Sequence, residues 1–160
     1  IVKWPGKLTA GSTSDKLVCS TDFFATFGDL LGEEIPENNG EDSFSFIDVL
    51  TDQKVAYPRA DVALYSKKAI SYINGDWKLV RFNTDKKGNH QLFNLKQNPN
   101  ELLLEHQSED VINITKNTPK KYQINLADDP RYKSRLQKME KLLFLEMEKV
   151  GDPFKFWNQK

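Results

Sequence analysis

The stretch at residues 61–95, DVALYSKKAISYINGDWKLVRFNTDKKGNHQLFNL, decides the fold, because its apolar side chains recur at every second residue. This period is typical of half-buried β-strands, and turn-forming residues divide the stretch into four short runs. We therefore predict four strands, at residues 62–65, 69–73, 77–82 and 91–95. The short connections between them favour an antiparallel meander. Asn74-Gly75 indicates a type I′ turn, in which both central residues have positive φ.

A sheet with one apolar face needs a covering layer, and the C-terminal part of the chain offers a helix for it. Asp129 can cap this helix and Pro130 suits its first position, while Gly151 and Pro153 end it. Its apolar stripe has helical spacing: Leu136, Met139, Leu143, Met147 and Val150. We interpret the stripe as core packing rather than as a cofactor site or a dimer seam. Residues 98–126 form a polar excursion with a strand or turn of its own, and the aromatic run 154–157 should dock on an apolar surface.

The segment before the sheet combines a short strand, a loop and a helix. Residues 2–4 are apolar and stop at Pro5-Gly6, which predicts a strand that enters a turn. Ser20-Thr21-Asp22 offers a helix cap, and Gly32 can end the helix that follows. The apolar face of this helix should pack on a sheet: Phe23, Phe24, Phe27, Leu30 and Leu31. One or two further helical turns are expected within residues 43–50.

These elements define an α+β fold. A roughly four-stranded antiparallel sheet is covered by a long C-terminal helix and preceded by the strand–loop–helix segment. We divide the chain into residues 1–50, the end of a larger domain, and residues 51–160, the subdomain that holds the meander and the last helix.

The composition excludes several classes of partner. The 23 basic and 23 acidic residues cancel, so no net charge favours a nucleic acid or an anionic membrane. No apolar run approaches the ~20 residues that a bilayer span needs. The single cysteine, Cys19, excludes an internal disulfide, and its apolar neighbours indicate a buried structural thiol. The chain starts with neither Met nor a signal peptide, so we expect it to be part of a longer protein.

The sequence contains no recognisable catalytic constellation. His90 and His106 have no partner at metal-ligand spacing and no carboxylate placed to orient them, so we interpret both as surface histidines. A nucleophile elbow and a glycine-rich phosphate loop are both absent from the sequence. Helix capping explains Asp128-Asp129, and the basic cluster at residues 116–121 could hold an anion but is better explained as a solvated surface. Asn113-Ile114-Thr115 matches a glycosylation acceptor, which matters only in a protein that a eukaryote secretes.

Short motifs occur along nearly the whole chain in a fixed order: IVKWPGK at 1–7, TDFFAT at 21–26, LLG at 30–32, NGEDSF at 39–44, NGDWKLV at 74–80, LFNL at 92–95, NPNE at 98–101 and NLA at 125–127. This ordered set resembles the C-terminal portion of sulfatases. The chain departs from the family at Ala25, where proline is usual, and at residues 71–73, which lack a basic residue. Residues 102–125 separate two motifs that are normally adjacent.

The resemblance implies what the parent protein does. Sulfatases hydrolyse sulfate esters with a formylglycine made from Cys or Ser in a C/S-x-P-S-R motif, beside a divalent cation, usually calcium. Cys19 is followed by Ser-Thr-Asp-Phe, so it is not the precursor, and no catalytic residue or metal ligand can be placed on this chain. We expect an inactive scaffold that packs on the upstream catalytic domain of the same polypeptide. Arg59, Lys67 and Lys68, which precede strands, are the candidate residues for the rim of the substrate cleft.

By the same resemblance, the parent would act on a sulfated small molecule or glycan and would be periplasmic, secreted or lysosomal. Two alternatives remain open. One is the C-terminal part of a phosphonate or phosphate monoester hydrolase. The other is a free-standing binding module, for example for carbohydrate, which would be stable and monomeric alone, whereas a severed subdomain should expose an apolar patch.

Overall fold

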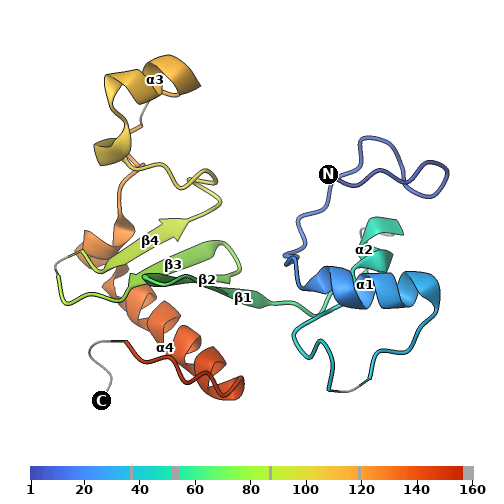
Figure 1. The fold of residues 1–160 in the computed structure, drawn as a ribbon. Helices are drawn as coiled ribbons and strands as arrows, with labels where there is room; N and C mark the ends of the chain where they lie inside the picture. Colours follow the sequence, from blue (N-terminus) through green and yellow to red (C-terminus); the bar gives the residue numbers. More distant parts are fainter. Residues whose placement is uncertain (37, 52–54, 87, 119, 157–160) are drawn as a thin grey trace. The chain divides into compact units, whose positions relative to one another are not determined.

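The computed structural model describes residues 1–36, 38–51, 55–86, 88–118 and 120–156 of the chain. The chain forms two compact units, Ile1–Val62 and Ala63–Lys160, each with its own packing (Figure 1). The α+β class predicted from the sequence is confirmed. The predicted division at residue 50 concerns the parent protein and stays a prediction. None of the helices formed by the described residues is long and apolar enough to cross a bilayer.

The four predicted strands form one sheet in the order β1-β2-β3-β4. Their bounds are β1 Asp61–Tyr65, β2 Ala69–Asn74, β3 Trp77–Phe82 and β4 His90–Asn94. The antiparallel register places Leu79 opposite both Tyr72 and Leu92, so one buried row crosses three strands. Since side chains alternate between the faces of a strand, this register commits one whole face of the sheet to the core.

The turn between β2 and β3 differs from the expected type. Asn74 pairs with Trp77, so Gly75 and Asp76 are the two loop residues. Gly75 has a φ of 55°, whereas neither Asn74 nor Asp76 has a positive φ. A type I′ turn needs two positive values, so that prediction is wrong; a positive φ at the first central residue alone fits type II′. The hairpin itself is confirmed.

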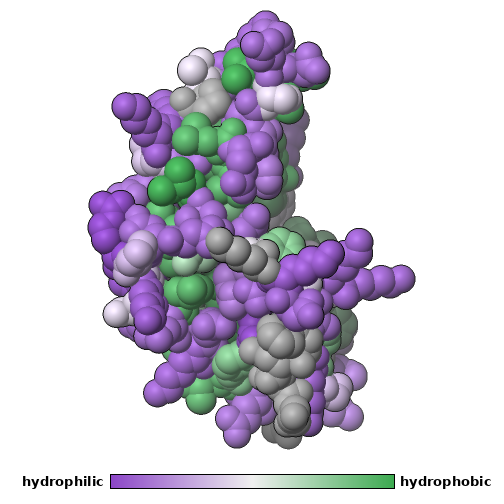
Figure 2. Space-filling view, turned by 90° about the vertical axis from the view of Figure 1, so that its left-hand side faces the viewer, coloured by the Kyte–Doolittle hydropathy of each residue, from purple (hydrophilic) through white to green (hydrophobic). Residues whose placement is uncertain are grey.

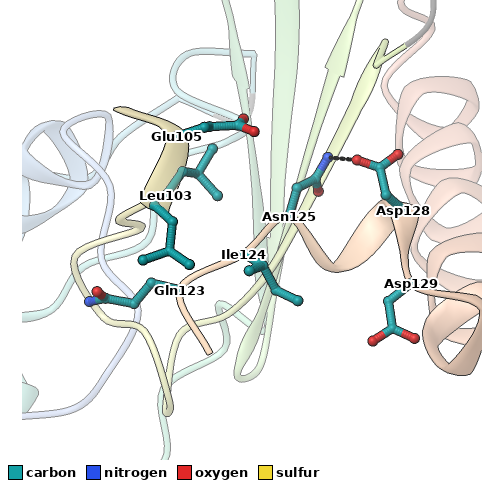
Figure 3. A pocket seen from close by; sticks show the side chains of 8 residues that line it. Leu103, Glu105, Gln123, Ile124, Asn125, Asp128 and Asp129 are labelled. Carbon is teal, nitrogen blue, oxygen red and sulfur yellow. Dashed lines mark hydrogen bonds between the residues drawn. The ribbon is translucent and has the colours of Figure 1, made fainter. Parts of the chain in front are cut away.

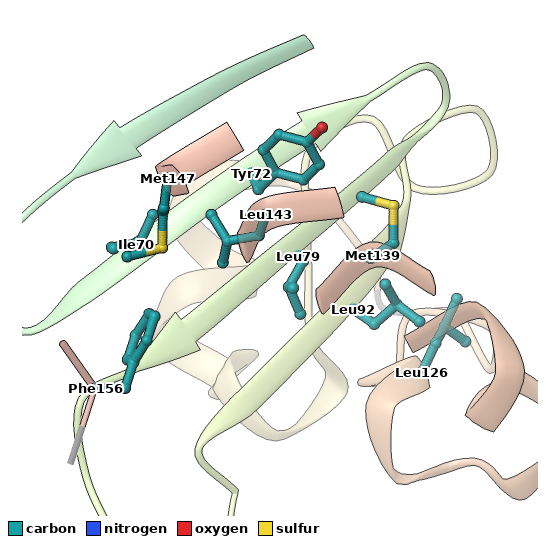
Figure 4. Packing of buried hydrophobic residues seen from close by; sticks show 9 residues of the cluster. All are labelled: Ile70, Tyr72, Leu79, Leu92, Leu126, Met139, Leu143, Met147 and Phe156. Atoms are coloured by element: carbon teal, nitrogen blue, oxygen red, sulfur yellow. The ribbon is translucent and has the colours of Figure 1, made fainter. Parts of the chain in front are cut away.

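Helix α4 (Lys133–Lys149) covers the sheet, as predicted (Figures 1 and 4). Its buried stripe is Met139, Leu143 and Met147, which joins one core with Ile70, Tyr72, Leu79, Leu92 and Leu126. Val150 is exposed, because the helix has ended before it. The Asp129 side-chain atom Oδ1 accepts a hydrogen bond from the Arg131 amide. It thereby caps a short 3₁₀ turn, η3 (Pro130–Tyr132), that leads into α4.

The last described residues dock on this core, as expected for the aromatic tail. Phe156 is 1% exposed, and its ring packs edge-on against Phe144 and Phe154. Trp157, also part of the predicted tail, lies outside the described residues.

The excursion between sheet and helix is helical rather than extended. It holds η1 (Leu104–His106), α3 (Glu109–Thr115) and η2 (Leu126–Asp128), and its described residues form turns but no strand. The side chain of Asn125 takes the place of a neighbouring strand at the edge of β4. Its Oδ1 accepts from the Leu92 amide at 3.0 Å, and its Nδ2 donates to the His90 carbonyl at 2.9 Å. One amide thus satisfies two backbone groups that would otherwise lack partners.

The first unit contains α1 (Asp22–Leu31) and α2 (Ile47–Thr51). Within residues 1–36, no segment is a strand, so the strand expected at residues 2–4 is not formed here. The turn expected after it is formed, and the Trp4 carbonyl accepts hydrogen bonds from the Lys7 and Leu8 amides. Gly32 ends α1 with a φ of 70°, as predicted. The predicted side-chain cap is wrong, because Ser43 Oγ, from a distant loop, accepts from the Ala25 amide at 2.8 Å instead.

Candidate functional site

The apolar side chains of α1 lie on the surface of their unit, contrary to the prediction that they pack on a sheet. Phe23, Phe24 and Phe27 are 46%, 52% and 54% exposed. Leu30 and Leu31 at the end of the helix are 45% and 74% exposed. Phe23 stacks on Phe27 and also meets the Phe46 ring in an edge-to-face contact. We call these five residues the α1 face; they form an exposed apolar group on a single helix of the first unit.

The side of α1 that the unit does bury is polar. Asp22 is fully buried and Thr26 is 5% exposed. Thr26 Oγ1 accepts from the Phe46 amide at 3.1 Å, and Asp22 Oδ1 accepts from the Phe44 amide at 3.1 Å. Hydrogen bonds therefore fasten the helix to the loop before α2, in addition to the contact between the Phe23 and Phe46 rings.

Arg59, the first of the three candidate rim residues, completes this network. Its guanidinium forms a two-pronged ion pair with the Asp22 carboxylate, with Nε at 2.9 Å from Oδ2, and donates a further bond of 2.6 Å to the Asp42 carbonyl. The Tyr57 hydroxyl donates to Asp22 Oδ2 at 2.8 Å. The Arg59 side chain is 8% exposed and lies over the Phe44 ring. In this unit Arg59 holds α1 in place, and whether it also reaches a substrate stays a prediction.

The electrostatics of the network follow from burial and pairing. Burial would raise the pKa of Asp22, but the hydrogen bonds from Arg59, from the Cys19 and Phe44 amides and from Tyr57 outweigh it and lower that pKa. Burial, together with the bond to the Asp22 carboxylate, raises the pKa of Tyr57 to about 12, so the phenol remains a donor. Cys19, expected to be buried, is only half-buried, and its amide donates to Asp22 Oδ2 at 2.7 Å.

Lys67 and Lys68, the other two candidate rim residues, are exposed in the turn between β1 and β2. The turn is stabilised by Ser66, whose Oγ accepts from the Ala69 amide at 3.1 Å. These two lysines belong to the second unit and Arg59 to the first, so neither unit brings the three together. Their role at a substrate cleft stays a prediction.

His90 has a carboxylate partner that the sequence did not reveal. Its Nε2 lies 2.9 Å from Glu140 Oε1 on α4, and Arg81 on β3 lies 3.7 Å from the same oxygen. The hydrogen bond from His90 lowers the pKa of Glu140, against a smaller raising effect of burial. The Arg81 guanidinium also lies over the rings of Phe144 and Phe156, at 4.8 and 4.0 Å from their centres. The prediction that no carboxylate orients His90 is wrong; His106 is exposed, as expected.

One hollow of the second unit lies between η1 and η2 and measures about 370 Å³ (Figure 3). Leu103 and Ile124 form part of its wall, and carboxylates from Glu105, Asp128 and Asp129 lie around it. Two of these are already engaged, since Asp128 accepts from Asn125 at 3.0 Å and Asp129 pairs with Arg131. Across the described residues, no three His, Cys, Asp or Glu side chains are grouped so as to hold a metal ion. The hollow therefore shows no catalytic set.

Comparison with protein families matches residues 1–128 to the C-terminal part of N-sulphoglucosamine sulphohydrolase. This is most of the chain. The chain belongs to this sulphohydrolase family. A comparison with curated proteins gave no match.

Among solved structures, the fold of this family member is similar to that of BT4656, which was determined in complex with its substrate D-glucosamine-2-N,6-O-disulfate. The TM-score is 0.68 at 19% identity, and the match covers 99% of this chain but 30% of BT4656. A second structure, BT33336S-sulf, reported with the metabolism of glycosaminoglycans by Bacteroides thetaiotaomicron, has a TM-score of 0.49 at 18% identity and is matched over 78% of this chain and 24% of its own. The chain thus spans under a third of the length of each of these two structures.

The sulphohydrolase motifs in this chain serve packing. Lys78 of the NGDWKLV motif and Glu101 of the NPNE motif form an ion pair with 2.6 Å between Nζ and Oε2. Asn98 holds the same loop through bonds to the backbone of Leu102, 2.8 and 3.0 Å long. Asn125 of the NLA motif satisfies the edge of β4. In this chain, these motif residues therefore stabilise the fold of the second unit.

Proposed function

We propose that this chain is the C-terminal scaffold of a sulfatase and that the catalytic residues lie in another part of the same polypeptide. The match of residues 1–128 to the C-terminal part of a sulphohydrolase carries the proposal. The absence of a C/S-x-P-S-R motif from the sequence supports it, as does the sequence around Cys19, which does not fit a formylglycine precursor. We place the cation and the formylglycine on the remainder of the parent protein.

The parent would act on a sulfated small molecule or glycan, with Lys67 and Lys68 as candidate contacts at the rim of its cleft. Both are exposed cations in a short, hydrogen-bonded turn, which suits recognition of a sulfate group. The substrate named for BT4656 carries two sulfate groups and fits this class. A compartment outside the cytoplasm stays our expectation for the parent.

Activity assays test the proposal. The purified 160-residue chain should not hydrolyse a chromogenic aryl sulfate with or without calcium, whereas the complete product of its gene should. Turnover by the chain alone would contradict the proposal. If the complete product cleaves a chromogenic phosphonate ester but no sulfate ester, the alternative of a phosphonate or phosphate hydrolase is correct.

A further inference from the structure

We infer that the α1 face is a preformed docking surface for the upstream domain of the sulfatase chain, an inference that rests on the proposed function. The face consists of Phe23, Phe24, Phe27, Leu30 and Leu31. At 100° per residue, these five positions occupy an arc of about 120° on the helix, and Asp22 and Thr26 fall outside it. The face is therefore one continuous apolar stripe.

The size of the stripe exceeds what scattered surface residues need. A buried aromatic side chain covers 150–250 Å², so three half-exposed rings present about 300 Å², to which two leucines add. An apolar patch of this size matches the largest patch on a typical monomeric protein, and such patches are often functional. No charged residue lies within the stripe, which is typical of a permanent interface rather than a transient one.

The unit holds this stripe outward. Rotating α1 to bury the phenyl rings would pull Asp22 away from Arg59 and from the Phe44 amide, and Thr26 away from the Phe46 amide. It would leave the buried guanidinium without its carboxylate, which costs several kcal/mol. The Phe24 ring also packs against the backbone at Gly40, where a Cβ would lie 2.6 Å from the ring. The face is thus ready before any partner arrives.

The occupant follows from the share of the fold that the chain represents. The chain aligns over 99% of its length with a structure of which it covers 30%, so the larger part of such a protein lies outside it. A covalently attached domain is present at a high effective concentration and needs no selective charge pattern to find the face. A second copy of this chain is the competing occupant, and the experiment below separates the two.

Thiol labelling of the complete gene product tests the inference. In a Cys19→Ser background, with any upstream thiol that reacts replaced likewise, Leu31→Cys places a thiol on the α1 face, and Phe27→Cys serves as a second probe should the first fail to fold. Ile114→Cys on α3 is the matched control, because Ile114 is 82% exposed and Leu31 is 74% exposed. Maleimide should react at similar rates with both positions in the 160-residue chain. In the complete product, labelling at Leu31→Cys should slow by at least about tenfold, since a covered site reacts only through local opening.

Equal labelling rates at the two positions in the complete product would overturn the inference. The inference would also be overturned if Leu31→Cys is already protected in the 160-residue chain and the protection rises with the concentration of that chain. Such a result would show that a second copy covers the α1 face. Sulfatase activity of the same preparation is read separately. A protected face in a product without sulfatase activity would refute the proposed function and leave the docking surface standing.

Discussion

Helices α1 and α4 both carry an apolar stripe at helical spacing, yet α4 buries its stripe and α1 exposes it. Met139, Leu143 and Met147 of α4 are 1%, 0% and 5% exposed beneath the sheet of their own unit. The three phenylalanines of α1 are about half exposed, and the unit buries Asp22 and Thr26 instead. Helical periodicity shows that a helix is amphipathic, but it does not show which layer covers the apolar side.

The covering layer explains the difference. In α4 the layer is the meander, which the chain itself supplies. For α1, the described residues supply the Phe46 ring, the Ile35 side chain beside Gly28 and a hydrogen-bonded loop, and the α1 face stays about half exposed. Hydrophilic side chains predominate on the face of the molecule drawn in Figure 2, and apolar areas lie between them. A chain whose two helices differ in this way is what a subdomain detached from its neighbour should look like.

Loss of the Asp22 carboxylate should affect the comparison most strongly. Asp22→Ala leaves the buried Arg59 unpaired, so we expect the first unit to lose about 3–5 kcal/mol while α4 is unaffected. Hydrogen exchange of the α1 and α4 amides measures the two units separately. Asp29→Ala, an exposed carboxylate on the same helix, is the control and should change little. If the α1 amides exchange as slowly in Asp22→Ala as in the unsubstituted chain, the ion pair does not hold α1 in place.

Two leucines sharpen the contrast in packing. Leu143→Ala empties a fully buried position of α4 and should cost about 2–5 kcal/mol. Leu31→Ala removes the same atoms from α1 at 74% exposure and should change the stability of the isolated chain by no more than about 0.5 kcal/mol. Urea unfolding of both variants gives the two values. Similar losses at both positions would show that α1 is covered within this chain.

Acid should act on the two helices through different carboxylates. The pKa values of Asp22 and Glu140 are both lowered in the folded chain. Each group therefore adds stability above its unfolded pKa, about 3.9 for Asp and 4.3 for Glu, and the gain is lost as the pH falls through the folded value. Asp22→Asn should flatten the acid dependence of protection in α1 only, and Glu140→Gln in α4 only. Protection factors measured between pH 6 and pH 3 check this; a change in both helices from one substitution would contradict it.

The sheet and the last helix could be predicted from the sequence because their signals are local. Alternating apolar residues, a glycine-containing turn and the Asp129-Pro130 pair fix the elements within a few residues of each other in the chain. The prediction of a strand at residues 2–4 is wrong, because a strand needs a neighbouring strand to pair with and residues 1–36 contain none. The predicted turn type is wrong because Asn74 pairs with Trp77, which makes Gly75 and Asp76 the central residues instead of Asn74 and Gly75.

The polar networks were beyond the sequence for a different reason. Asp22 and Arg59 lie 37 positions apart, and His90 and Glu140 lie 50 apart, so no spacing rule connects them. Only the fold brings each pair together. The position of Arg59 before a strand made it a candidate rim residue, whereas in this unit its charge neutralises Asp22. A buried ion pair of this kind leaves no short motif to find.

Binding of a hydrophobic dye to the 160-residue chain tests the central claim most directly. The double variant Phe27→Gln, Leu31→Gln removes the centre and end of the α1 face, and Ile114→Gln, Leu145→Gln removes two exposed apolar residues of the second unit as a control. We predict that the α1 variant loses most of the dye fluorescence. If the unsubstituted chain self-associates instead of binding dye, the α1 variant should lose that self-association. Its helix content, measured by circular dichroism, should not change. Fluorescence that the α1 variant keeps and the control variant loses would contradict the claim that α1 presents its apolar face to a missing domain.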